Sequence, residues 1–375
     1  MENSNKLKDK IFVTKPFLPP LKEYTELLED IWKNKQLTNK GPFHEKFEIA
    51  LKDYLKVEYV SLVNNATTGL IIALRALGIK GDVITTPFSF IATAHSIKWN
   101  GLNPIFVDID PSTCNINPDK IEDAITDQTT AILPVHIYGN PCDTKNIKSI
   151  AIKNNLRVIY DGAHAFGVTH NRKSILNEGD LSVLSFHATK LFNTFEGGAI
   201  VSHSSEMKKR IDDLKNFGFQ NEITVDGIGI NGKMNELQAA LGLLQLKYFN
   251  KVIEKRKRIA KIYREGLMDV NGISFIYDNK GVKNNYAYFP IFIDEKIFGK
   301  KRDEVYEELK KHNIYGRRYF YPLISQFGAY QDLQSAEKKN LPVAEQISKE
   351  VICLPIYPDL DNRDIERIVK IINTL

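Results

Sequence analysis

The sequence predicts an α/β fold with a largely parallel sheet, followed by a smaller domain that mixes helices and strands. Short apolar runs alternate with helical patterns from Glu58 to Val201, and this alternation is typical of α/β layers. The runs are nearly continuous in their apolar character, as in strands that are covered on both faces. Near Lys233 the pattern changes to a long helical period.

The apolar runs give the expected strands of the large sheet. Amphipathic stretches between them, such as Thr68–Leu77 and Asp143–Asn155, are expected to form the crossover helices that parallel strands require. A mostly parallel, seven-stranded sheet is therefore predicted, with its strands at Tyr59–Val63, Val83–Thr86, Pro104–Asp108, Ala131–Val135, Arg157–Asp161, Leu181–Phe186 and Gly198–Val201.

A long helix is expected to lead out of the large domain. Apolar residues recur at helical spacing from Leu237 to Tyr248, and a charged stretch continues at the same period. Beyond it, Tyr286–Ile293 predicts a strand, whereas Asp303–His312 and Asp364–Ile372 predict helices. We place the boundary near residue 250, which gives a large domain of residues 1–250 and a smaller α+β domain of residues 251–375.

Composition excludes several classes of protein. The net charge is +5, and the basic residues are scattered or interleaved with acids, which argues against a nucleic-acid partner. The three cysteines have no CxxC spacing, so neither a disulfide framework nor a metal site is expected. The first residues lack the apolar segment of a signal peptide, and no apolar run approaches the ~20 residues of a membrane span. We expect a cytoplasmic protein that does not insert into membranes.

Residues that could bind a ligand or take part in a reaction lie at the ends of three expected strands, where open α/β sheets bind ligands. Asn64–Thr68 opens a helix and offers free backbone N–H groups to a phosphate, although an ordinary helix cap explains these residues as well. Asp161 ends another strand and could simply cap the following turn. Lys190 follows a third strand among apolar neighbours such as Phe186 and Phe192, and such surroundings favour loss of its proton.

These three groups together fit pyridoxal 5'-phosphate (PLP). The cofactor needs a lysine to form a Schiff base with its aldehyde, an acid beside its pyridine nitrogen and a cradle for its phosphate. Lys190, Asp161 and the Asn65–Thr68 turn would supply these, and Phe90 after the second strand would supply an aromatic face for the ring. We therefore predict a PLP enzyme with Lys190 and Asp161 as its catalytic residues.

The sequence resembles the nucleotide-sugar aminotransferase family (DegT/StrS type), within the aspartate-aminotransferase-like PLP fold (fold type I). The resemblance covers nearly the whole chain and rests on motifs that occur in order: LTNKGPFHEKFE, NNATTGL, TTPFSFIATAHSI, PIFVDIDPSTCNI, ILPVHIYGNPCD, YDGAHAFG, SFHATKLFNTFEGG and GINGKMNELQAALG. The stretches WKNKQLTNKG, GNPCD and AHAFG are most like the branch that aminates C4 of a TDP-4-keto-6-deoxyglucose.

The resemblance implies roles for individual residues. Ala66 and Thr67 would hold the phosphate with Ser185, Phe90 would stack on the cofactor ring, Asp161 would pair with the pyridine nitrogen, and His164 would lie near the ring oxygen. Asn231 would reach the phosphate of the neighbouring subunit, which implies a homodimer with shared active sites. The residues implied in substrate binding are Thr38, His187, Arg317, Tyr319 and Tyr321.

Some positions depart from the family pattern. His164 stands where a glutamine is usual, Tyr160 where a glutamate is usual, and Lys233 where an arginine is common. Ala66 replaces a glycine but keeps a small residue in the cradle. The implied reaction is transfer of an amino group from L-glutamate to a nucleoside-diphosphate-linked 4-keto-6-deoxy sugar, for a surface polysaccharide such as the O-antigen of lipopolysaccharide.

Other functions stay open at this point. The chain could aminate C3 of a 3-keto sugar nucleotide, or it could be a non-catalytic nucleotide-sugar-binding or regulatory protein. It could also be a PLP-dependent sugar dehydratase, although related dehydratases carry histidine in place of the lysine. Gly227, Gly229 and Gly232 spell GxGxxG, which suggests a dinucleotide site. The helix that follows runs too far without a strand for that motif, so we interpret this segment as a loop that carries Asn231.

Overall fold

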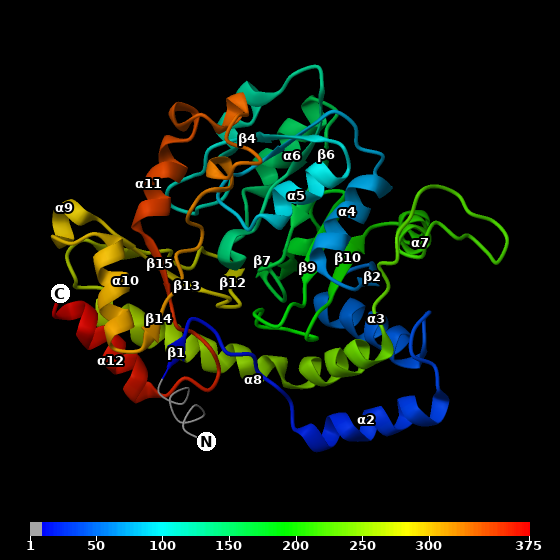
Figure 1. The fold of residues 1–375 in the computed structure, drawn as a ribbon, viewed down its shortest axis with the longest axis horizontal. Coiled ribbons are helices and arrows are strands. Elements are labelled where there is room, and N and C mark those ends of the chain that lie inside the picture. The colour runs from blue at the N-terminus through cyan, green and yellow to red at the C-terminus, as the bar shows by residue number, and fades with distance from the viewer. Residues whose placement is uncertain (1–9) are drawn as a thin grey trace.

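The computed structural model describes residues 10–375, and its centre is a seven-stranded sheet in the order β2-β10-β9-β6-β5-β3-β4 (Figure 1). The strand β10 runs antiparallel to both of its neighbours, and the other pairs are parallel. The predicted mostly parallel sheet is confirmed. Its strands are β2 (Tyr59–Val63), β3 (Asp82–Thr85), β4 (Asn103–Phe106), β5 (Thr129–Leu133), β6 (Arg157–Asp161), β9 (Leu181–Ser185) and β10 (Gly198–Ser202).

Helices cover both faces of this sheet. Alternate strand residues point to opposite faces, and the apolar side chains on each face are buried against helices. Leu184 belongs to a cluster with α3 and α8, whereas its neighbour Val183 packs in a cluster with α4 and α7. These helices and the others of the large domain are α2 (Leu21–Asn34), α3 (Pro42–Leu55), α4 (Ala66–Ala76), α5 (Ala92–Trp99), α6 (Thr144–Lys153), α7 (Ser205–Leu214) and α8 (Glu236–Leu267).

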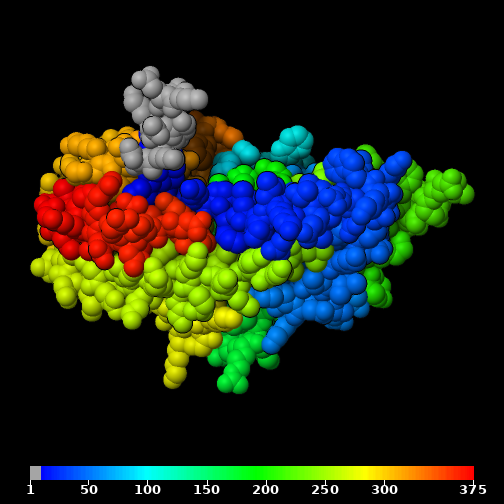
Figure 2. All heavy atoms as spheres, turned by 90° about the horizontal axis from the view of Figure 1, so that it is seen from below, coloured from blue at the N-terminus to red at the C-terminus, as the bar shows by residue number. Residues whose placement is uncertain are grey.

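The helix α8 joins the two parts of the chain. It is continuous over 32 residues and begins with a capping box in which Asn235 and Gln238 exchange hydrogen bonds. The boundary predicted near residue 250 falls inside it. Its first half packs on α2 and α3, and its second half on α12 (Asn362–Asn373). Figure 2 shows α2, α8 and α12 together on one face of the molecule.

The C-terminal part has a core of its own around a sheet in the order β11-β13-β15. The strand predicted at Tyr286–Ile293 is shorter in the structure, because the backbone of residues 286 and 287 bonds to the buried Arg256 instead of a strand. The elements here are β11 (Ile273–Phe275), β13 (Phe289–Ile293), α9 (Glu295–Phe298), α10 (Arg302–Lys311), α11 (Pro342–Glu350), β15 (Val351–Leu354) and α12. Shorter strands are β1 (Ile11–Phe12), β7 (Thr169–His170), β8 (Lys173–Ser174), β12 (Val282–Lys283) and β14 (Ile314–Tyr315).

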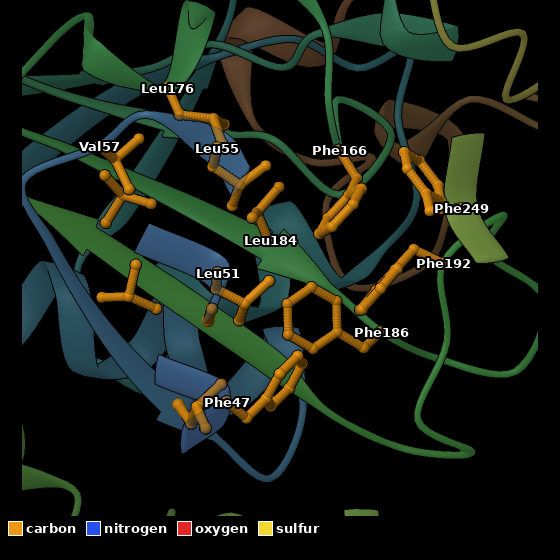
Figure 3. Packing of buried hydrophobic residues seen from close by; sticks show 14 of the residues in the cluster. Phe47, Leu51, Leu55, Val57, Phe166, Leu176, Leu184, Phe186, Phe192 and Phe249 are labelled. Carbon is orange, nitrogen blue, oxygen red and sulfur yellow. The ribbon is translucent and has the colours of Figure 1, made fainter. Parts of the chain in front are cut away.

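An aromatic cluster lies under the carboxyl end of the sheet (Figure 3). Phe166 stacks on Phe192 with ring centroids 4.0 Å apart, and Phe186 and Phe249 meet Phe192 edge to face. Full burial of a phenylalanine contributes about 1.5–3 kcal/mol. The cluster therefore anchors two loops of the sheet edge, the one that ends in Phe166 and the one between Phe186 and Phe192.

Membrane-spanning helices, cysteines and metal-binding groups were searched for among the described residues. No helix among residues 10–375 is long and apolar enough to cross a membrane. The three cysteines are free and buried. No group of histidine, cysteine and acidic residues in this range could hold a metal ion.

Candidate active site

A cavity of about 340 Å³ opens at the carboxyl edge of the sheet, beside the ends of β2, β6 and β9. Both halves of the chain line it, since Tyr288, Arg317, Tyr319 and Phe320 come from the C-terminal part. Ten of the predicted site residues meet here: Ala66, Thr67, Phe90, Asp161, His164, Ser185, His187, Lys190, Arg317 and Tyr319.

Lys190 lies in a turn that the aromatic cluster holds from both sides. Phe186 and Phe192 are fully buried and Leu191 nearly so, whereas Phe195 is 46% exposed. The turn closes with a hydrogen bond from the backbone N–H of Lys190 to the carbonyl of His187, at 2.8 Å. Burial lowers the pKa of Lys190 to about 8, against the opposing charge of Asp161. The neutral, nucleophilic amine is therefore more populated near neutral pH than in an ordinary exposed lysine.

Asp161 is a buried carboxylate at the end of β6. One oxygen accepts a hydrogen bond from the hydroxyl of Thr93 at 2.8 Å, and the other accepts from the backbone N–H of Ala163 at 3.0 Å. Burial raises its pKa, and these two donors oppose the rise. Such a carboxylate gains stability when a cationic group is placed beside it, as the protonated nitrogen of a pyridine ring would be.

His164 is held as a neutral hydrogen-bond donor. Its Nδ1 atom accepts the backbone N–H of Tyr138 at 3.2 Å, so the ring proton is on Nε2. Burial and then the charge of Lys190 keep its pKa well below the usual value. The ring meets Phe320 at a centroid distance of 6.0 Å with an interplanar angle of 6°. A glutamine amide at this position would also donate, so the histidine preserves that capacity.

The start of α4 fits a phosphate group. The side chain of Asn65 caps the helix by accepting the N–H of Thr68 at 2.8 Å. Within residues 10–375, the N–H groups of Ala66 and Thr67 have no hydrogen-bond partner. Gly198 passes so close that a Cβ atom there would lie 2.9 Å from the nitrogen of Ala66. An anion would fit here, because the wall lacks a side chain at Gly198 and the N–H groups are free. The positive end of the helix dipole also favours a negative charge. We call this site the anion cradle.

Ser185 and Phe90 complete the surroundings expected for PLP. The Ser185 hydroxyl accepts the N–H of His187 at 3.4 Å, which leaves its own proton free to donate. Phe90 is 59% exposed at the cavity wall, where a planar ring could cover it. The lysine, the buried acid, the cradle and the aromatic face are thus present in one cavity, and the residues fit the cofactor.

Three predicted residues lie outside this cavity of the same protomer. Tyr321 packs against the guanidinium groups of Arg302 and Arg318, at 4.8 and 5.5 Å from its ring. Thr38 and Asn231 are both exposed, and neighbours of each line a second cavity, of about 420 Å³. The structure therefore does not bring Thr38 and Asn231 to the Lys190 of their own chain.

The segment with the GxGxxG motif is a loop, as expected. The loop after α7, to which it belongs, projects from the molecule (Figure 1), and α8 begins only at Glu236. His136 is buried with its ring stacked on Tyr160, at a centroid distance of 4.7 Å. His187 is at the cavity wall, with Nδ1 2.8 Å from the Thr189 hydroxyl.

Sequence reasoning missed two residues that contact the predicted catalytic pair. Thr93 lies inside the quoted motif TTPFSFIATAHSI, but nothing in its spacing points to Asp161, which is 68 positions away. The hydroxyl of Tyr288 lies 3.5 Å from Nζ of Lys190. The only sequence signal that Tyr288 borders the site was its place near the start of the expected strand Tyr286–Ile293, because the start of a strand can lie beside a site.

Comparison with known proteins gives a consistent picture. The sequence pattern of the DegT/DnrJ/EryC1/StrS aminotransferase family matches residues 21–373. A dTDP-4-amino-4,6-dideoxy-D-glucose transaminase of Shigella dysenteriae is 53% identical over 365 residues, which cover 97% of this chain and 99% of that protein.

Solved structures agree with the fold at similar coverage. DesI, crystallised in the presence of its TDP-sugar product, matches with a TM-score of 0.93 and 34% identity over 98% of this chain and 93% of that chain. NtdA of Bacillus subtilis with the bound cofactor PMP matches with a TM-score of 0.86 and 29% identity, over 94% of this chain and 81% of that chain.

Proposed function

This chain belongs to the DegT/DnrJ/EryC1/StrS aminotransferase family, and on that premise we propose that it transfers an amino group from L-glutamate to C4 of TDP-4-keto-6-deoxy-D-glucose. The product is the TDP-4-amino-4,6-dideoxy sugar. The observation that carries this proposal is the identity of 53% to the Shigella transaminase over nearly the full length of both chains. PLP is the cofactor of this family of sugar-nucleotide aminotransferases.

The residues of the cavity divide the work of this reaction. PLP, when bound, supplies an electron sink for the carbon that loses or gains a proton. The N–H groups of Ala66 and Thr67 would bind its phosphate together with the Ser185 hydroxyl, and Phe90 would cover the ring. Asp161 would keep the pyridine nitrogen protonated.

Lys190 would move the proton, and His164 would orient the cofactor. The Nζ atom of Lys190 would take the proton from the α-carbon of the donor amino acid as a general base and deliver it to the cofactor. In the second half of the reaction it would move a proton from the cofactor to C4 of the sugar. Its lowered pKa, about 8, suits both directions of transfer near neutral pH. The Nε2–H group of His164 donates to the ring oxygen of the cofactor and holds it in orientation.

The substrate enters past the C-terminal wall of the cavity. Arg317 offers a guanidinium for the diphosphate, and Tyr319 offers a hydroxyl from the same part of the chain. His187, after β9, offers a polar group from the large sheet. We assign Tyr321 to the outer part of this entrance, where Arg302 and Arg318 fix its ring.

We propose further that two chains share their active sites. Thr38 and Asn231 are exposed and outside the cavity of their own protomer, so any contact with cofactor or substrate has to be made in the neighbouring subunit. The loop before Asn231 carries uncovered apolar side chains, with Ile223 92% and Ile228 77% exposed, and burial against a second chain would remove them from water.

Replacement of Lys190 by alanine tests the reaction. The variant should lose both the absorbance of the Schiff base between lysine and cofactor and turnover with glutamate and the keto-sugar nucleotide. Lys209→Ala, which removes an exposed lysine paired with Asp213, serves as the control and should keep both. A Lys190→Ala protein that turns over at the normal rate would refute the proposed function.

Mixing of inactive subunits tests the shared site. If Asn231 acts in the neighbouring cavity, Asn231→Ala and Lys190→Ala homodimers are each impaired, but their heterodimer holds one cavity with both native residues. Unfolding and refolding the two variants together should then restore activity. Activity that does not rise above the sum of the separate variants contradicts the assignment.

A further inference from the structure

Tyr288 supplies a hydroxyl to the amine of Lys190 from the other half of the chain. Nζ of Lys190 lies 3.5 Å from the Tyr288 hydroxyl and 5.9 Å from the centroid of its ring. Among residues 10–375, this is the only side-chain hydrogen bond of the lysine. Burial raises the pKa of Tyr288, so the phenol is neutral. It can accept from the ammonium form of the lysine and donate to the amine form.

Asn285 ties the backbone before Tyr288 to the loop that carries His164. Its Nδ2 atom donates to the carbonyl of His164 at 2.7 Å and to the carbonyl of Phe166 at 3.0 Å. Its Oδ1 atom accepts the N–H of Ala287 at 3.0 Å. The side chain is fully buried, and a buried amide with satisfied donors and acceptor fixes the segments that it joins.

Arg256 holds the same segment from the side of α8. Its guanidinium donates to the carbonyls of Tyr286 and Ala287, both at 3.0 Å, and to the carbonyl of Ile356 at 2.8 Å. It is 1% exposed. A buried charge is costly unless it is hydrogen-bonded, and here its donors go to main-chain carbonyls. Two buried polar side chains therefore fix the position at which Tyr288 enters the cavity.

The ring of Tyr288 is also fixed by aromatic contacts. It meets His164 edge to face at a centroid distance of 4.9 Å, and it meets Tyr319 in the same manner at 5.6 Å. The hydroxyl cannot swing away from Lys190 without breaking these contacts. A flexible lysine side chain, in contrast, has up to about 2 kcal/mol of rotamer entropy to lose when it is placed.

We propose that Tyr288 is a positioning residue, which holds the Lys190 amine in place for proton transfer, and that Asn285 and Arg256 hold Tyr288 in register. The proposal rests on the proposed function of Lys190. The phenol can hydrogen-bond to the lysine in both of its protonation states, and its own charge does not change. It thereby restricts the amine after the amine has been freed from the cofactor.

The test reads the ionisation of Lys190 directly in the cofactor-free protein. Lys190 is labelled with an amine-reactive reagent over a range of pH, and mass spectrometry gives the labelled fraction. Tyr288→Phe keeps the ring but removes the acceptor of the ammonium, so the labelling midpoint should move to lower pH, with an ionisation constant roughly three times larger. Tyr263→Phe removes a buried hydroxyl that donates to the Pro355 carbonyl, and this control should leave the midpoint unchanged.

Two further measurements separate positioning from general damage to the fold. With the holoenzyme, Tyr288→Phe should lower kcat about threefold to tenfold and leave KM for glutamate unchanged. Asn285→Ala retains the phenol but frees its backbone, so it should shift the labelling midpoint in the same direction as Tyr288→Phe. Thermal unfolding confirms that each variant is folded at the labelling temperature.

The outcomes are distinct. An unchanged midpoint and unchanged kcat in Tyr288→Phe overturn the role of Tyr288. A shift in Tyr288→Phe without one in Asn285→Ala overturns the role of Asn285. Full turnover by Lys190→Ala refutes the proposed function instead, and the labelling midpoints do not depend on that result.

Discussion

Substitution of Thr93 by valine removes one donor from Asp161 while it keeps the β-branched shape of the side chain. The lost hydrogen bond is 2.8 Å long, buried, and made to a carboxylate. Hydrogen bonds to charged groups contribute about 1.5–3 kcal/mol. We therefore expect the cofactor-free protein to lose about 2 kcal/mol of its free energy of unfolding at neutral pH.

The pH dependence of this loss identifies its source. Burial raises the pKa of Asp161 in the folded protein, and loss of Thr93 raises it further. A group with a raised pKa contributes stability that is present in acid and is lost as the pH rises through the folded-state pKa. The variant loses more of this stability on the way to neutral pH. The difference between variant and parent should consequently shrink in acidic buffer, where the carboxyl is protonated in both.

Urea unfolding of the cofactor-free proteins at several pH values measures both effects. Ser96→Ala is a matched control on the same helix, because it removes a buried hydroxyl that donates to the Thr93 carbonyl at 2.8 Å. It should cost about 1 kcal/mol, with no dependence on pH. A loss in Thr93→Val below 0.5 kcal/mol, or one that is equal at all pH values, would refute the role given to this hydroxyl.

Three further predictions concern the cradle, a helix cap and the lysine. Gly198→Ala places a Cβ atom 2.9 Å from the nitrogen of Ala66. It should weaken PLP binding at least tenfold, about 1.4 kcal/mol, in a titration of the cofactor-free protein. An unchanged affinity for PLP would contradict the role of the cradle. Glu236 caps α3 by accepting two backbone N–H groups, each at 2.8 Å, so Glu236→Gln should cost about 2 kcal/mol in urea unfolding. The rate of PLP capture should rise with pH through about 8, the pKa of Lys190, because the neutral amine is the nucleophile; a rate that is flat across that range argues against Lys190.

Most of the fold follows from local pattern. The seven apolar runs form strands within about two residues of the predicted limits. Strands that are buried on both faces need a continuous run of apolar residues, and such a run can be recognised in the sequence. The sheet order and the antiparallel direction of β10 depend on long-range pairing, which periodicity does not report. The shortened strand at β13 has a similar cause, since Arg256 on a distant helix takes the carbonyls of residues 286 and 287.

The site shows the same division between local and distant information. Lys190 and Asp161 could be predicted because Asp161 ends β6 and Lys190 lies in the turn that follows β9. The carboxyl ends of parallel strands meet at one edge of the sheet. Thr93 and Tyr288 could not, because their contacts span 68 and 98 positions of sequence. Thr38 and Asn231 were predicted from resemblance alone. Both are exposed in the protomer, and the expected role of Asn231 in a neighbouring subunit stays a prediction.

Transfer of labelled nitrogen tests the central claim most directly. The purified protein with PLP is incubated with ¹⁵N-labelled L-glutamate and a panel of keto-sugar nucleotides, and the products are analysed by NMR. The account predicts a ¹⁵N amine at C4 of the sugar when TDP-4-keto-6-deoxy-D-glucose is the acceptor. Nitrogen at C3, or a product that has lost a hydroxyl without gaining nitrogen, would contradict it.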